Sequence, residues 1–359
     1  MQVTSQQLAH TPRRQAFTLV ELLVVISIVT LLASMVLVAL AGVQETARVD
    51  RTRAQIARID TLVMEKWDGY KSRRFAVPQS PTPALVAYWG LSNPLEFRRK
   101  SSLYIGRYQV DAVRELMRME LPDRQSDVLE WNTLPGTQPS ALWLAYRNKA
   151  RKLIMQKRGK VLPSANDPNN NFAAEILDPN NGWTFQHQAA ECLYLILSQI
   201  NDRERSALEF FSETEIGDTD SDGIPEILDA WGQPIVFARW APGLQIPGSP
   251  QDGHAPDPFD LRAIYFTMHE VNTFALYPLI ASSGPDRQLE IFHDNGSNLY
   301  SDRINYAKTN PPNNPYLSIS NVYQQANVPF PVGSPLLDAS GIPKAGYLDN
   351  ITNQNLAGS

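Results

Sequence analysis

The stretch of sequence that decides the fold reads FTLVELLVVISIVTLLASMVLVALAGVQ over residues 17–44. Glu21 is its only charged residue, so an uncharged run of 23 residues extends from Leu22 to Gln44. At about 1.5 Å per helical residue this run is roughly 35 Å long, which is enough to cross the hydrocarbon core of a bilayer. Its valine, isoleucine and threonine content would suit a strand in water, but lipid offers no partner for main-chain polar groups and forces a helix. The stretch therefore predicts the transmembrane part of a helix over residues 17–42.

Glu21 is the exception in this apolar stretch. An unpaired carboxylate is costly to bury in lipid, so a buried Glu21 requires a cationic partner. Alternatively, Glu21 lies at the level of the lipid headgroups, where water solvates it and the span begins. Energetics alone leave both interpretations open.

The residues around Glu21 resemble a known processing signal. Ala16-Phe17-Thr18-Leu19-Val20-Glu21 follows a short leader with two arginines and precedes the apolar run. This arrangement resembles the class III signal of type IV prepilins and type II secretion pseudopilins. The resemblance implies a leader peptide over residues 1–16, cleavage between Ala16 and Phe17 by a prepilin peptidase on the cytoplasmic side, and N-methylation of Phe17. Ala16 departs from the glycine usual at this position, but alanine is also small.

The same resemblance implies a role for Glu21 in assembly. In that family this glutamate pairs with the N-terminal amine of a neighbouring subunit, here the amine of Phe17, as the filament forms. Such a pair would supply the partner that a buried carboxylate requires. The resemblance also implies a single-pass protein of the cytoplasmic (inner) membrane, with a short cytoplasmic N-terminus and a periplasmic head.

An ordinary secretory signal is the competing interpretation of the N-terminus. Ala39-Leu40-Ala41 before Gly42 has the small-x-small form of a signal peptidase site. However, the apolar segment is longer than the usual h-region of about 7–15 residues, and Glu21 lies near its basic flank. Arginines lie on both sides of the span, so the positive-inside rule does not decide the orientation.

Residues 43–75 continue the helix as an amphipathic segment. Four apolar residues recur at spacings of 7, 3 and 4, with charged residues between them: Val49, Ile56, Ile59 and Val63. No proline occurs between Arg13 and Val77, although the chain has 27 prolines. We therefore expect one helix from Phe17 to about Asp68, with Gly69 as its end signal and its second half packed on a globular domain. A tethered domain on a helical stalk would produce the same pattern.

The remaining sequence predicts an α+β fold. Residues 76–210 read as a mainly helical insertion, with helices near 110–119, 141–156 and 186–200. Residues 211–308 read as a β-rich head with a small antiparallel sheet, and residues 309–359 as an irregular tail rich in proline and asparagine. Cys192 is the only cysteine, which excludes an internal disulfide, and its apolar surroundings predict a core position.

An acidic loop is the most specific motif outside the predicted N-terminal helix, which we call the stem. Residues 218–229 read DTDSDGIPEILD, with carboxylates at positions 1, 3 and 5, glycine at 6, and acids at 9 and 12. This is the spacing of a calcium loop, and it is similar to the Asp-rich repeats of dockerin and thrombospondin type 3 modules. The predicted Ca²⁺ ligands are Asp218, Asp220, Asp222, the carbonyl of Ile224, Glu226 and Asp229. Because Pro225 disfavours an exiting helix, we expect a single calcium loop that stabilises the head. The alternative is a solvated Asp/Gly turn that binds no ion.

Two motifs in the head read as turns that adjoin strands. Residues 229–234 read DAWGQP before the apolar residues 235–237, and residues 279–286 read LIASSGPD. They resemble the Asp-x-Trp-Gly-x-Pro and Ser-x-Gly-Pro-Asp elements of the major pseudopilins. Members of that family bind calcium through a loop placed differently, so the resemblance assigns no ligands in residues 218–229.

A basic run and the scattered histidines are further candidate sites. Seven basic residues and no acid lie in residues 147–160, after Trp143 and Tyr146. A nucleic-acid or lipid-surface patch is conceivable, but we expect the solvated face of a helix, because the net charge is −5 and no general basic field surrounds the chain. The five histidines form no close pair, and neither a Gly-x-Ser-x-Gly elbow nor a phosphate loop is present. We expect no enzyme and no nucleic-acid partner.

These features predict a pilin-like structural subunit, assembled into a type II secretion pseudopilus or a type IV pilus-like filament. Its expected partners are prepilin peptidase, other pilin or pseudopilin subunits, an inner-membrane assembly platform and the lipid bilayer. The alternative is a membrane-anchored calcium-dependent binding module that does not polymerise.

Overall fold

The computed structural model divides the chain into two compact units, residues 1–48 and residues 49–359. It describes residues 18–76, 82–129, 137–166, 171–176, 182–202, 205–244, 251, 254–264, 273–293, 332–338 and 340–356. Ala16 and Phe17 of the predicted processing site lie outside these residues.

Helix α1 (Leu19–Tyr70) has 52 residues and includes the predicted helix from Leu19 to Asp68, but it ends five residues before the predicted boundary at residue 75. No proline interrupts it, and it runs one residue past Gly69, the predicted end signal. In the first unit its apolar side chains are exposed. This part of the helix is long and apolar enough to cross a membrane. The predicted single apolar helix near the N-terminus is confirmed.

In the second unit, one face of α1 is part of the core. Its buried residues recur at helical spacing and include the predicted Ile56, Ile59 and Val63, all fully buried, while Val49 is partly buried. Farther along, the Trp67 ring packs on Phe259 with 5.1 Å between ring centroids. The amphipathic pattern of residues 43–75 therefore identified the buried face correctly.

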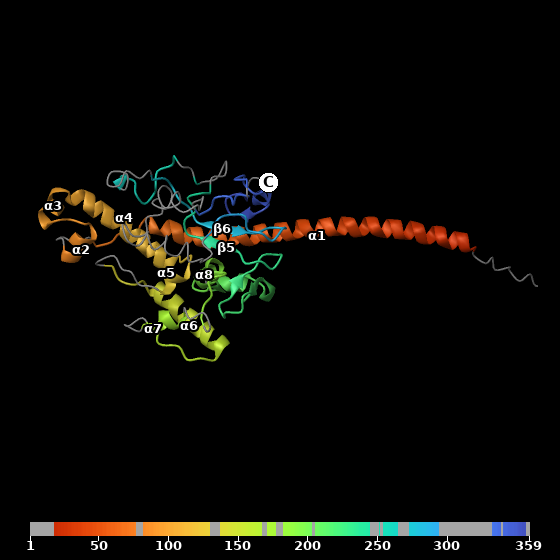
Figure 1. Cartoon of the computed structure of the whole chain (residues 1–359), viewed down its shortest axis with the longest axis horizontal. Coiled ribbons are helices and arrows are strands. Elements are labelled where there is room, and N and C mark those ends of the chain that lie inside the picture. The colour runs from red at the N-terminus through yellow and green to blue at the C-terminus, as the bar shows by residue number, and fades with distance from the viewer. Residues whose placement is uncertain are drawn as a thin grey trace, which may run out of the picture. The chain divides into compact units, whose positions relative to one another are not determined.

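Seven further helices follow α1 in the described part of the chain (Figure 1). They are α2 (Pro83–Tyr88), α3 (Pro94–Arg99), α4 (Ser101–Glu120), α5 (Gln125–Leu129), α6 (Ala141–Arg158), α7 (Asn171–Ile176) and α8 (Gln188–Leu197). Local sequence sets several of their ends: Ser140 caps α6 by accepting a hydrogen bond from the Trp143 N–H, and Gly159 ends it with a φ of 64°. The predicted helices near 110–119, 141–156 and 186–200 correspond to α4, α6 and α8.

Short antiparallel ladders make up the β structure. Strands β1 (Asn201–Asp202) and β2 (Arg205–Ser206) form one pair, and β3 (Ile216–Gly217) and β4 (Glu226–Ile227) form another. The largest sheet has the order β5 (Val236–Ala238), β6 (Leu279–Ser282) and β7 (Ile351–Thr352), and Figure 1 shows β5 beside β6. Both strands predicted from the head motifs are present and pair with each other, with Phe237 opposite Ile280.

Helix α8 lies at the centre of this unit. All ten of its residues are buried, including Cys192 as predicted, and the helix contacts α5, α6, β4 and β5. The main hydrophobic core extends from Ile56 in α1 through α8 to Ile351 in β7. The helical region and the β structure therefore share one core.

Buried ion pairs also join the helical region to the β structure. In α4, Arg114 pairs with Asp257 at 2.6 Å, and Arg118 pairs with Glu115 at 2.7 Å. The Arg239 guanidinium lies 2.8 Å from Asp127, whose carboxylate also faces Arg118 at 3.4 Å. Each buried charge in this network is compensated, as burial away from water requires.

Three 3₁₀ turns complete the described elements: η1 (Ala207–Phe210), η2 (Glu213–Glu215) and η3 (Ala345–Leu348). The predicted irregular tail of residues 309–359 is thus partly packed, because β7 extends the main sheet at β6. Gly284 allows this close approach: it has a φ of 70°, and a Cβ there would clash with the carbonyl oxygen of Asp349.

Candidate functional site

The N-terminal end of α1 holds Glu21 in a reciprocal pair of contacts with Thr18. The Thr18 N–H and Oγ1 each donate to Glu21 Oε2 at 2.9 Å, and the Glu21 N–H donates back to Thr18 Oγ1 at 3.2 Å. This is the geometry of a helix capping box, which satisfies main-chain donors at the helix start. It places the Glu21 carboxylate beside the first residues after the predicted cleavage site.

The first part of α1 presents an unbroken apolar surface. The large side chains between Leu19 and Val43 are 48–79% exposed in the single chain. The hydroxyls on this segment donate to main-chain carbonyls of the same helix, as in Ser27 to Leu23 and Ser34 to Leu31, both at 2.8 Å. A surface with its polar groups satisfied internally suits lipid or other apolar helices.

The acidic loop connects β3 to β4 and continues into the turn before β5. Ser221 and Gly223 both have positive φ, 64° and 111°, so the chain turns sharply at this point of the loop. Strand β4 begins directly after Pro225, in agreement with the expectation that no helix leaves the loop.

The structure brings most of the predicted metal ligands together but not all of them. Asp218, Asp220 and Asp222 each place a carboxylate oxygen within 4.8 Å of the others. Ile224 is buried, and its N–H donates to Asp222 Oδ1 at 2.9 Å. Glu226 belongs to a second acidic group, which it forms with Asp220 and one residue from outside the loop.

Asp229 has a different environment from the other acidic residues of the loop. Its Oδ1 accepts hydrogen bonds from the N–H groups of Trp231 and Gln233, both at 2.9 Å, and its Oδ2 accepts one from Ser282 Oγ at 2.7 Å. These bonds fix the turn before β5 and tie it to β6. The predicted ligand Asp229 is thus engaged with the sheet, outside both acidic groups.

Glu191 of α8 is the residue that sequence reasoning missed. It completes the group with Asp220 and Glu226, with one oxygen of each within 4.8 Å of the others. Glu191 is fully buried; its Oε2 accepts a hydrogen bond from Trp183 Nε1, while its Oε1 has no hydrogen-bond partner. Burial, together with the nearby Asp222, raises the pKa of Glu191 well above its ordinary value. One signal was available: Glu191 is the only charged residue in a ten-residue helix that is mostly apolar.

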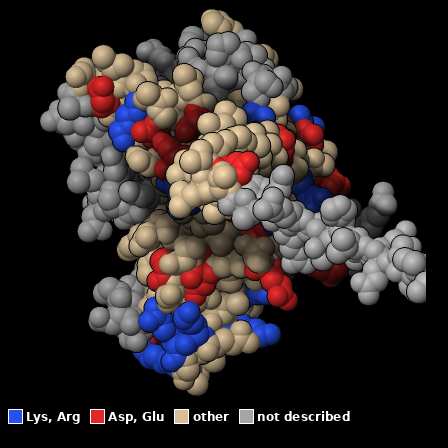
Figure 2. All heavy atoms as spheres, turned by 90° about the vertical axis from the view of Figure 1, so that its right-hand side faces the viewer, with Lys and Arg blue, Asp and Glu red and all other residues tan. Residues whose placement is uncertain are grey.

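The basic run of residues 147–160 differs in part from the expected solvated face. Arg147 is buried and donates to the carbonyls of Ala165 and Val128, and Arg151 donates to the carbonyls of Leu162 and Pro163. The expectation is wrong for these two arginines, because their guanidinium groups satisfy main-chain carbonyls of α5 and of the segment that follows α6. Lysine and arginine side chains do gather at the bottom of the view in Figure 2, where Figure 1 places α6, with acidic side chains above them.

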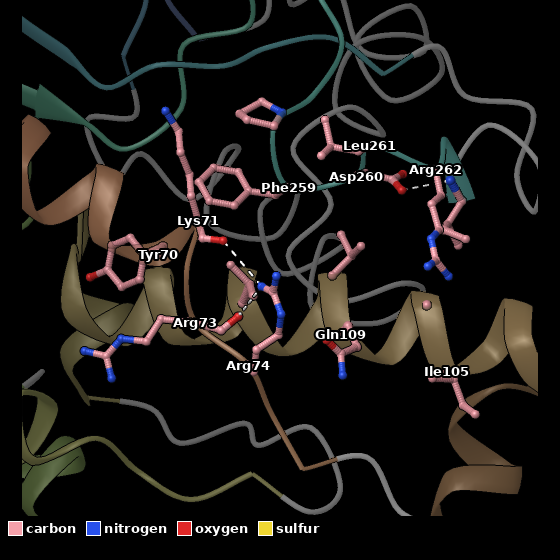
Figure 3. A pocket seen from close by; sticks show the side chains of 15 residues that line it. Tyr70, Lys71, Arg73, Arg74, Ile105, Gln109, Phe259, Asp260, Leu261 and Arg262 are labelled. Atoms are coloured by element: carbon pink, nitrogen blue, oxygen red, sulfur yellow. Dashed lines mark hydrogen bonds between the residues drawn. The ribbon is translucent and has the colours of Figure 1, made fainter.

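A cavity of about 510 Å³ lies where the end of α1 meets α4 and residues 258–264 (Figure 3). Two of its basic side chains make contacts within the protein. Arg74 Nη1 lies 3.4 Å from the Lys71 carbonyl and 3.2 Å from the Arg73 carbonyl, and Lys71 Nζ lies 2.7 Å from Asp68. These two cations therefore stabilise the end of α1, and the cavity presents no cluster of groups suited to catalysis among the described residues.

Comparison with known proteins identifies the N-terminal segment. Residues 11–37 match the family described as the prokaryotic N-terminal methylation motif, the signal of type IV pilins and pseudopilins. No curated protein and no solved structure matches the chain. The predicted resemblance to the pilin-type N-terminal motif is thereby confirmed, and the motif leads directly into the exposed apolar part of α1, which fits a single-pass membrane anchor.

Proposed function

We propose that this protein is a pilin-like structural subunit, without enzymatic activity, that assembles into a type II secretion pseudopilus or a type IV pilus-like filament. The observation that carries the proposal is the methylation motif of residues 11–37 at the start of an exposed apolar helix. Prepilin peptidase would cleave between Ala16 and Phe17 and leave a methylated Phe17 as the mature N-terminus. The head would then lie in the periplasm, anchored by α1 in the inner membrane.

Assembly follows from the surface that the single chain leaves exposed. The apolar part of α1 has lipid as its partner in the membrane, and packing against the same segment of other subunits would replace lipid contacts by helix contacts as subunits leave the membrane at an assembly platform. Apolar packing alone sets no register. The Glu21 carboxylate can do so by pairing with the Phe17 amine of a neighbouring subunit, because a charge that is paired in lipid costs far less than one that is not.

Mass spectrometry of the mature N-terminus tests the processing step. The protein would be purified from its native membrane and digested, and the N-terminal peptide sequenced. We expect a peptide that begins at Phe17 and carries one N-methyl group. A mature chain that begins at Gly42, as signal peptidase cleavage would produce, or an uncleaved chain that begins at Met1, would contradict the proposal.

Variants of Glu21 test the assembly step. Glu21→Gln retains an oxygen acceptor for the Thr18 N–H but has no charge to pair with an amine. We expect normal membrane insertion and cleavage of this variant but loss of filaments or of subunit crosslinks through α1. Glu45→Gln is the matched control, because Glu45 lies on the same helix and its carboxylate pairs with Arg48 of its own chain at 3.5 Å. Normal assembly of Glu21→Gln would rule out the pairing mechanism, and a processed subunit that never polymerises would favour a membrane-anchored binding module.

A further inference from the structure

Five carboxylates converge between α8 and the β3–β4 loop. Asp220 is common to two acidic groups, one with Asp218 and Asp222, the other with Glu191 and Glu226. In the part of the chain that the structure describes, one salt bridge reaches these five side chains, from Lys157 to Asp218 at 3.0 Å. The excess of negative charge requires either protons or a cation.

Two oxygen atoms of this group are buried without a hydrogen-bond donor. Glu191 is fully buried and its Oε1, which belongs to the side chain facing Asp220 and Glu226, has no hydrogen-bond donor. Asp218 Oδ1 is likewise buried without a partner. A buried carboxylate without a partner is strongly unfavourable in its charged form, so Glu191 requires either a proton or a cation at this oxygen.

We propose that Glu191, Asp220 and Glu226 hold one divalent cation, with Asp218 and Asp222 completing its surroundings, and that the cation is Ca²⁺. Oxygen ligands lie about 2.3–2.6 Å from Ca²⁺, so two ligands on opposite sides of the ion are about 5 Å apart. The observed separations within 4.8 Å match that span before any adjustment. The donor set is made of oxygen alone, which suits Ca²⁺, whereas structural zinc sites are built from cysteine and histidine.

The ion would connect two parts of the second unit that are distant in sequence. Glu191 lies on the central helix α8, whereas three of the other carboxylates lie on the loop from β3 to β4 and the fourth, Glu226, is the first residue of β4. Next to the site, the Thr184 N–H donates to Asp222 Oδ2 at 2.6 Å, so the segment before α8 already contacts the loop. A cation here couples the helical region to the β structure and stabilises their shared core. This inference depends on the second unit alone and is independent of processing and assembly.

A melting experiment tests the site. The full-length protein in detergent would be treated with a chelator and heated with Ca²⁺, with Mg²⁺ or with neither. We expect saturating Ca²⁺ to raise the melting temperature by about 5 °C, and Mg²⁺ to do less, because Mg²⁺ requires a more rigid octahedral site. Glu191→Gln should fold without the ion, since the neutral amide has nearly the same shape as the carboxyl group, and it should lose most of the Ca²⁺ effect. Glu175→Gln is the control, because Glu175 is a surface carboxylate paired with Lys160.

Terbium luminescence provides a second measurement on the same protein. Tb³⁺ commonly replaces Ca²⁺, and Trp183 donates to Glu191, so its indole lies beside the site and should sensitise the bound lanthanide. We expect Ca²⁺ to displace the signal, Trp183→Phe to reduce it, and Asp220→Asn to weaken Tb³⁺ binding by about tenfold or more. The inference is overturned if neither ion alters the wild-type protein, or if Glu191→Gln and Asp220→Asn both respond like wild type. If no ion bound but the mature N-terminus were a methylated Phe17, the proposed function would still hold and only the cation site would be rejected.

Discussion

Burying the charged side chain of Lys66 costs free energy, and the neighbouring groups reduce this cost without removing it. Its ammonium group lies on the buried side of α1, 3.2 Å from the Tyr146 hydroxyl. Burial lowers the pKa of Lys66 to about 8, although the nearby Glu120 carboxylate opposes the shift. The folded protein therefore binds this proton less tightly than the unfolded chain, and the charged form of Lys66 destabilises the fold.

Replacing Lys66 by methionine should stabilise the protein in a pH-dependent way. The penalty is fully present below about pH 8 and disappears as pH rises toward about 10.5, where the unfolded lysine also loses its proton. We expect Lys66→Met to raise the free energy of unfolding near pH 7 by on the order of 1–3 kcal/mol, and the gain to shrink toward about pH 10. The Tyr146 hydroxyl keeps a partner, because it donates to the Glu120 carbonyl at 2.9 Å.

Urea unfolding of the detergent-solubilised protein across this pH range measures the difference. Lys152→Met is the control, since Lys152 is exposed on α6 and should give a small change at every pH. A gain for Lys66→Met that stays constant from neutral to alkaline pH would contradict the explanation.

Individual residues also show how much of the candidate sites could be predicted from the sequence. Glu21 and the Asp218–Glu226 part of the loop stand out in sequence because their spacing is local, and local spacing sets local geometry. Glu191 lies 27 residues before the loop begins, and only the tertiary fold brings it to Asp220. Asp229 fits the spacing of a calcium loop, but the turn before β5 and Ser282 use its oxygens, which no one-dimensional pattern reveals.

Among the elements, α1 was predicted almost completely. A proline-free run with one apolar period defines both its length and its buried face, and Ile56, Ile59 and Val63 lie where that period places them. Helix α4 was predicted only as a helix. Its Arg114 and Arg118 are buried in ion pairs, while the pattern rule assigns charged residues to the solvent side, so the packing of this helix had no readable signal.

The packed half of α1 leads to a prediction at the element scale. Ile59 is fully buried, so Ile59→Ala should leave a cavity and lower the free energy of unfolding by about 2–5 kcal/mol. Ile342→Ala deletes the same atoms from a side chain that is 60% exposed and should cost well under about 1 kcal/mol. Equal losses for the two variants, measured by urea unfolding, would show that α1 does not contribute to the core of the second unit.

At the scale of the whole molecule, the end of the chain belongs to the same core as the stem. Asn353, directly after β7, donates through Nδ2 to Asp60 of α1 at 2.7 Å and to the Pro278 carbonyl at 3.0 Å, while its Oδ1 accepts from the Ile280 N–H at 3.0 Å. One amide thus joins α1, the main sheet and the tail. The composition of residues 309–359 indicates an irregular tail. It does not show that Asn353 packs on α1 and the sheet, because these contacts depend on partners up to nearly 300 residues away in the sequence.

Truncation after Leu348 tests whether this tail is part of the cooperative fold. The shortened chain loses buried Ile351 and the three hydrogen bonds of Asn353, and it leaves β6 with an open edge. We expect the free energy of unfolding to fall by about 4 kcal/mol or more, since a buried isoleucine alone is worth about 2–5 kcal/mol, and we expect aggregation through the exposed edge. Asn353→Ala keeps the strand and removes only the side-chain bonds, so it should cost about 1–3 kcal/mol without aggregation. If the truncated protein unfolded at the same urea concentration as the full chain, β7 would be an appendage to the sheet, and α1 would hold the second unit together without it.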